Sequence, residues 1–201
     1  MKDFGPGAGQ YASWKDDKEK RRLFMERLVN IVKTRVRHSF VNSVILADYR
    51  KVDELYPLSE MNKPFALAGS TCIEKVRRWA RKWNIDESRV AYMFEDGDKD
   101  RGDLIRCAQR DHGVAVKLMK KSESVAFQAA DLLAYEHRLA NKRIYEAGVG
   151  TLGLTDLRSS LQALKDIPHG SDGEDWGVYD LESLTTQCMM NKYPLRSSFS
   201  A

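Results

Sequence analysis

The sequence predicts an α/β protein, and two observations support this prediction. Short apolar segments rich in β-branched residues alternate along the chain with longer segments whose apolar residues recur at helical spacing. This alternation favours a sheet with parallel neighbouring strands, covered by the helices that connect them. The 201 residues include 42% hydrophobic and 31% charged residues, which is enough apolar material for one core and enough charge for a soluble surface.

The first half of the chain alternates as expected. A helix is predicted at residues 17–36, where Leu23, Leu28 and Val32 help to line one side. A β-prone run at 40–47 predicts a strand that ends at Asp48. The next helix is predicted at 64–83, because it begins at a proline, which suits a first helical turn.

The second half of the chain continues the alternation of strands and helices as far as about Tyr145, and short helices and a loop follow. We predict a strand at 90–94, a helix at 100–111, a strand at 114–118 and a long helix that extends to about Tyr145. After Gly150, short helices at 156–166 and 181–191 flank a loop at 168–177. The expected organisation is therefore a main domain at 1–149 and a small helical extension at 150–201.

A carboxylate stands out within the apolar run 125–135. Gln128 and Asp131 are its strongly polar side chains, and their spacing of three places them on one helix face. An ionised carboxylate in such a setting requires a cation, a hydrogen-bond donor or a cavity. One interpretation is a local ion pair with Lys120, Lys121 or Arg138. The other is a functional carboxylate, and in particular a metal ligand.

A second acidic group follows the predicted strand at 90–94. Glu95, Asp96 and Asp98 lie at its carboxyl end, which is where ligands bind in open α/β sheets. Clustered carboxylates suit Mg²⁺ or Mn²⁺, although an Asp-Gly-Asp sequence is also common in turns. Together with Asp131, and with Asp48 as an additional candidate, they can hold two ions about 4 Å apart for phosphodiester hydrolysis.

The predicted helix at 64–83 carries basic residues near its end, which are candidates for nucleic-acid contacts: Arg77, Arg78, Arg81 and Lys82. The net charge of +4 permits an anionic partner without requiring one. A plainer interpretation is that an apolar stripe on this helix faces the core and leaves the basic residues in solvent. The residues of that predicted stripe are Cys72, Val76, Trp79 and Trp83.

Other classes of function find little support in the sequence. The three cysteines lie far apart, and the four histidines are scattered, so neither a zinc site nor a disulfide framework is expected. No apolar run reaches the roughly 18 residues of a membrane span. Serines and histidines occur without a patterned partner, and no Gly-x-Ser-x-Gly motif occurs. We therefore expect a reduced, cytoplasmic protein that does not associate with membranes.

Several segments together resemble one family. The resemblance rests on residues 1–4, 19–21, 94–98 and 127–132. It is to the bacterial and phage family known as domain of unknown function number 3800, whose members are similar to ribonuclease-H-like proteins. Over roughly residues 1–146 it implies a mixed sheet flanked by helices and an acidic site for Mg²⁺ or Mn²⁺. Glu95, Asp96 and Asp131 would be ligands, Asp98 or Asp48 additional ligands, and Gln128 would orient Asp131 or a water.

The chain departs from this family at its start. Members usually begin with a strand that carries an Asp-Glu-Ser-Gly motif, which this sequence lacks. The resemblance therefore implies that the N-terminal strands and the first metal-binding aspartate are missing. We expect weak metal binding, little nuclease activity and an unpaired edge at strand 40–47, through which a homodimer can form.

Two functions follow as hypotheses. The first is a metal-dependent nuclease or nucleic-acid-processing protein, whose intact version would act on nucleic acid and which has little activity as this chain. The alternative is a non-enzymatic accessory factor of phage or mobile-element origin, which binds nucleic acid or protein.

Overall fold

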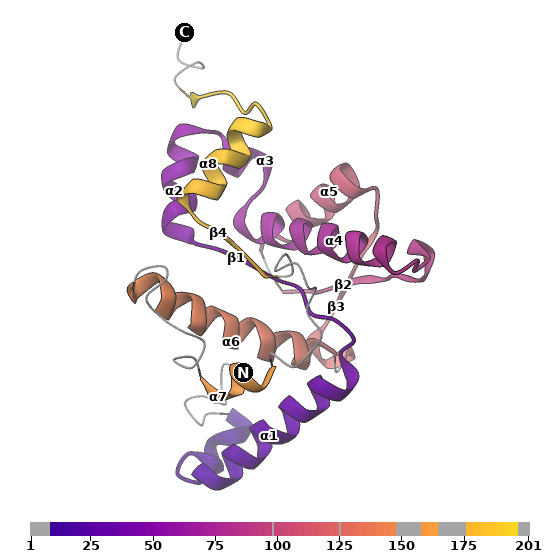
Figure 1. Cartoon of the computed structure of the whole chain (residues 1–201), viewed down its shortest axis with the longest axis vertical. Helices are drawn as coiled ribbons and strands as arrows, with labels where there is room; N and C mark the ends of the chain where they lie inside the picture. The colour runs from indigo at the N-terminus through magenta and orange to yellow at the C-terminus, as the bar shows by residue number, and fades with distance from the viewer. Residues whose placement is uncertain (1–8, 98, 125, 148–157, 165–175, 197–201) are drawn as a thin grey trace. The chain divides into compact units, whose positions relative to one another are not determined.

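The computed structural model describes residues 9–97, 99–124, 126–147, 158–164 and 176–196 (Figure 1). It divides the chain into two compact units, each made of two separate stretches. Unit 1 comprises Met1–Val41 and Lys121–Gly173, and unit 2 comprises Asn42–Lys120 and Glu174–Ala201. The α/β class is confirmed. The described residues are mainly helical, with two sheets of two strands each, and a ribonuclease-H-like mixed sheet stays a prediction.

Unit 1 is a helical assembly of α1 (Lys18–Arg35), α6 (Ala126–Ala147) and α7 (Ser159–Leu164), preceded by the 3-10 helix η1 (Gly9–Trp14). The α1 helix begins after Asp17, whose carboxylate accepts a hydrogen bond from the Lys20 N–H at 2.8 Å. Each of the three α-helices contributes to one buried apolar cluster, which contains Val29, Val32, Leu132 and Leu164. Burial of these side chains is what stabilises short helices such as α7.

The first part of unit 2 is a strand–helix–strand segment. Strands β2 (Tyr92–Glu95) and β3 (Val116–Met119) are parallel, with Tyr92 opposite Val116. They are connected by α5 (Arg101–His112), which ends at Gly113 because that residue adopts a left-handed conformation with φ of +66°. The parallel pairing that the alternating pattern predicted is confirmed here.

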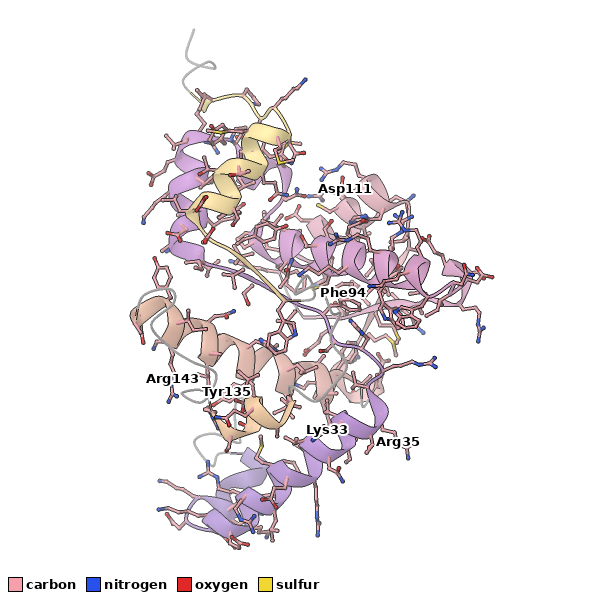
Figure 2. The ribbon with its side chains drawn as sticks, in the orientation of Figure 1. Lys33, Arg35, Phe94, Asp111, Tyr135 and Arg143 are labelled. Atoms are coloured by element: carbon pink, nitrogen blue, oxygen red, sulfur yellow. The ribbon has the colours of Figure 1, made fainter. Side chains whose placement is uncertain are left out.

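Helix α4 (Pro64–Lys82) packs beside α5, as Figure 1 shows. Their shared core contains Ala66, Ile73, Leu104, Cys107 and Ala108, with Phe94 of β2 packed against it (labelled in Figure 2). The short 3-10 helix η2 (Glu87–Arg89) connects α4 to β2.

The second part of unit 2 joins chain segments from both of its stretches. Strand β1 (Val41–Val44) pairs with β4 (Trp176–Tyr179), while α2 (Leu46–Leu55) and α3 (Leu58–Met61) pack with α8 (Leu181–Met190). A capping box starts α8, because the Asp180 carboxylate accepts the Ser183 N–H at 2.9 Å. The core shared by α2, α3 and α8 includes Tyr49, Val52, Leu184 and Cys188.

The structure corrects the predicted strand at 40–47. Strand β1 ends at Val44, and helix α2 begins at Leu46. Tyr49 and Val52 are buried three residues apart, which is helical spacing, whereas the preceding β-branched residues suggested a longer strand. Strand β4, which the sequence did not predict, pairs with β1.

The predicted loop at 168–177 lies mostly outside the described residues, but its last two residues belong to β4. The predicted core stripe of α4 is wrong at Trp83, which follows the end of the helix and is 65% exposed. The buried face instead includes Ala66, Gly69 and Ile73, because small residues at 66 and 69 let α5 approach closely.

Gly69 should be the position in α4 that is most sensitive to added volume. A Cβ atom there would lie 2.6 Å from Leu104 Cδ1 and 3.3 Å from Phe94 Cε1. Because Leu104 is fully buried, we expect Gly69→Val to lower the free energy of unfolding by about 2–3 kcal/mol. Urea unfolding measures this. Gly102→Val in α5 is the matched control, since the nearest atom lies 3.8 Å away, and equal losses for both variants would contradict the close contact.

Candidate functional site

Glu95 and Asp96 lie where the sequence placed them, at the carboxyl end of a strand with a parallel neighbour. Glu95 is the last residue of β2, and the Asp96 N–H donates to the Met119 carbonyl oxygen at 2.8 Å. Both residues are exposed. The Asp96 Oδ1 atom lies 3.3 Å from Arg101 Nε, so a cation that bound there would compete with a guanidinium. Asp98 lies outside the described residues.

Asp131 and Gln128 lie in the first turns of α6. Gln128 is exposed, and the partly exposed Asp131 carboxylate forms an ion pair with Lys121 in the 3-10 helix η3 (Lys121–Glu123). The local ion pair, one of the two interpretations of Asp131, is therefore confirmed. A ligand role for Asp131 stays a prediction, and it requires a metal ion to displace the Lys121 ammonium.

The strand-end position expected for Asp48 is wrong. Asp48 lies in the first turn of α2, where its side chain is 6% exposed and its Oδ1 atom lies 3.3 Å from Lys51 Nζ. A carboxylate in the first turn of a helix interacts favourably with the helix dipole. The environment of Asp48 is thus that of a structural residue of α2.

The candidate ligands divide between the two units. Glu95 and Asp96 belong to unit 2, and Asp131 belongs to unit 1. Within the described ranges, no group of three His, Cys, Asp or Glu side chains gathers around a point where it could hold a metal ion. The ligand roles of Glu95, Asp96 and Asp131 remain predictions.

The basic end of α4 is partly neutralised by acidic neighbours in unit 2. Arg77 pairs with Glu87 at 3.3 Å and also donates to the His112 carbonyl oxygen at 3.0 Å. Arg81 Nη2 lies 3.3 Å from Glu74 Oε1. Arg78 and Lys82, the other two candidates for nucleic-acid contacts, are exposed. These ion pairs weaken the positive field that a phosphate backbone would meet.

A buried carboxylate that the sequence analysis missed lies on the same helix as Asp131. The Glu136 side chain is 0% exposed, and in the described residues neither of its oxygens has a hydrogen-bond partner. Arg158 Nε lies 3.6 Å from Glu136 Oε2, and its guanidinium lies 5.7 Å from the ring centre of Tyr135 (labelled in Figure 2). Glu136 follows Leu132 by four residues, so helical spacing could have predicted that Glu136 lies on the buried face of α6.

Loss of Arg158 should destabilise unit 1. Arg158→Gln leaves the buried Glu136 carboxylate without its cation, which is costly in a protein interior. Because Arg158 is itself 42% exposed, we expect a loss of only about 1–3 kcal/mol in the free energy of unfolding. Lys142→Gln is the control, since its pair with Glu146 on α6 is exposed. A loss no larger than that of this control would contradict the importance assigned to the buried pair.

Comparison of the chain with protein-family models, curated proteins and solved structures gave no match. The family resemblance therefore rests on the quoted segments alone. None of the helices in the described part of the chain combines the length and the apolar character that crossing a membrane requires.

Proposed function

We propose that this chain is a ribonuclease-H-like protein that binds Mg²⁺ or Mn²⁺ for the hydrolysis of phosphodiester bonds in nucleic acid. The observation that carries the proposal is the position of Glu95 and Asp96, exposed at the carboxyl end of β2 beside its parallel neighbour β3. That end of a parallel pair is a common ligand site, and carboxylate oxygens suit these hard cations.

The proposed roles follow from the chemistry of the side chains. In unit 2, Glu95 and Asp96 supply carboxylate oxygens. In unit 1, Asp131 supplies one, and the exposed Gln128 orients Asp131 or a water molecule. Bound ions of this type activate water and stabilise the leaving oxygen of a phosphodiester.

The present partners of these carboxylates predict weak metal binding. Arg101 lies beside Asp96, and Lys121 lies beside Asp131. Each metal ion must displace a cation whose charge already compensates the carboxylate.

A second function is supported by a separate feature. Arg78 and Lys82 are exposed on the last turns of α4, which favours metal-independent binding of an anionic chain. Binding of this kind weakens steeply as salt rises and needs no divalent ion, so a salt titration with and without Mg²⁺ separates the two functions.

Thermal unfolding under Mn²⁺ titration tests the metal site. A ligand that binds only the native state raises its stability, by about 2.7 kcal/mol at a concentration of one hundred times Kd. We expect the melting temperature of the parent protein to rise with Mn²⁺, and Asp131→Asn to remove much of this rise. Lys121→Gln should enlarge the rise, because the competing ammonium is gone.

Glu146→Gln removes an exposed carboxylate elsewhere on α6. This variant is the matched control and should behave like the parent protein. The proposal fails if Asp131→Asn and Glu146→Gln respond to Mn²⁺ identically while both unfold cooperatively.

A further inference from the structure

Unit 2 contains a cavity of about 490 Å³, which is within the range of small-molecule sites. Its walls include Ser70, Thr71 and Glu74 of α4, His112 of α5 and Gln187 of α8. The Gln187 Oε1 atom is buried without a hydrogen-bond partner among the described residues.

Three side chains on the cavity wall are aligned. Ser70 Oγ lies 2.8 Å from His112 Nε2, and His112 Nδ1 lies 3.5 Å from Glu74 Oε2. The His112 side chain is only 9% exposed. Ser70 and Glu74 are four residues apart on α4, so the helix places them on one face.

The surroundings hold these groups in place. Arg77 donates to the His112 carbonyl oxygen at 3.0 Å, and Gly113 ends α5 directly after His112. The second oxygen of Glu74, Oε1, contacts Arg81 at 3.3 Å, which leaves Oε2 for the imidazole. Asp111, the residue before His112, is labelled in Figure 2.

The charge beside His112 Nδ1 favours one direction for the Ser70–His112 hydrogen bond. The Glu74 carboxylate, 3.5 Å from Nδ1, favours the tautomer in which Nδ1 carries the proton. His112 Nε2 then accepts the Ser70 hydroxyl. This is the nucleophile–base–carboxylate order that activates a serine, and the longer Nδ1–Oε2 distance is common before a substrate binds.

We propose that Ser70, His112 and Glu74 form a hydrolytic site for small, uncharged carboxylic esters. Ser70 Oγ attacks the carbonyl carbon while its proton passes to His112 Nε2. The ester C–O bond breaks, and the alcohol leaves with that proton. Water then attacks the acyl-serine and gives a proton to Nε2, and the acid departs as Ser70 regains its proton.

The wall of the cavity favours an uncharged ester. Arg110 also lines it, but this guanidinium is hydrogen-bonded to the Asp111 carboxylate at 2.9 Å, so the pair presents little net charge. Leu67 and Tyr193 add apolar surface. N–H donors on the same wall, including the Asn191 amide, are of the kind that stabilises a developing oxyanion.

The plainer role of the Ser70–His112 hydrogen bond is to hold α4 against α5. That role predicts a stable contact and no special reactivity at Ser70. Covalent labelling separates the two roles, because only an activated serine reacts readily with a fluorophosphonate.

The experiment uses the full chain, a fluorophosphonate probe and peptide mapping by mass spectrometry. We expect modification at Ser70 and none in Ser70→Ala. His112→Gln should slow labelling by about 100-fold or more, because general-base assistance is lost, and Glu74→Gln should slow it as well. Ser122→Ala, an exposed serine outside the cavity, is the matched control and should label like the parent protein. Hydrolysis of p-nitrophenyl acetate should follow the same order of variants.

Two results would overturn the proposal. One is the absence of label on Ser70 in protein whose circular dichroism is that of the folded chain. The other is labelling of Ser70 at a rate that Glu74→Gln and His112→Gln leave unchanged. Should His112→Gln fail to fold, Glu74→Gln decides alone, since Glu74 is partly exposed and its replacement keeps the side-chain shape.

Discussion

The close contact between Gly69 and Leu104 is the constraint on which unit 2 depends. A side chain at position 69 would meet Leu104 and Phe94 at once, so only a glycine lets α4 lie this near to α5 and β2. The apolar surface that is buried as a result holds the parallel pair β2–β3 against α4. The position of Glu95 and Asp96 at the end of β2 therefore depends on this contact.

Another face of α4 serves a different purpose. Lys75, which is buried, donates from Nζ to Asn42 Oδ1 at 3.0 Å, and Thr71 Oγ1 lies 2.8 Å from the Tyr179 hydroxyl oxygen. Polar contacts thus connect α4 to the segments around β1 and β4, while its apolar face contacts α5. The cavity lined by Ser70 and Glu74 is a consequence, since the residue next to Gly69 is brought to the end of α5.

The sequence predicted those elements that carry their own boundary signals. Helix α1 has the Asp17 cap, α4 begins at Pro64, and α5 ends at Gly113. Helix α2 lacks such a signal, because no side chain caps its first turn and the β-branched run before it extends the strand pattern. Strand β4 has four residues, too few to show a period of its own, and it is stabilised by pairing with β1.

Much less of the candidate sites could be predicted. The strand-end position of Glu95 and Asp96 followed from local sequence. Lys121, which pairs with Asp131, was one of three cations that the sequence offered as partners. The burial of Glu136 depends on how α7 packs, and the Ser70–His112 contact joins residues 42 positions apart. Contacts between residues so far apart in the sequence follow from tertiary packing, which the spacing of residues along one helix does not reveal.

The tautomer of His112 tests most directly whether the packing of α4 on α5 builds an activated serine. Nitrogen-15 NMR of the imidazole, recorded above pH 8 where an ordinary histidine is neutral, distinguishes a protonated Nδ1 from a protonated Nε2. We predict a proton on Nδ1 and an Nε2 signal that moves in Ser70→Ala. A proton on Nε2, or an Nε2 signal indifferent to Ser70→Ala, would contradict this prediction.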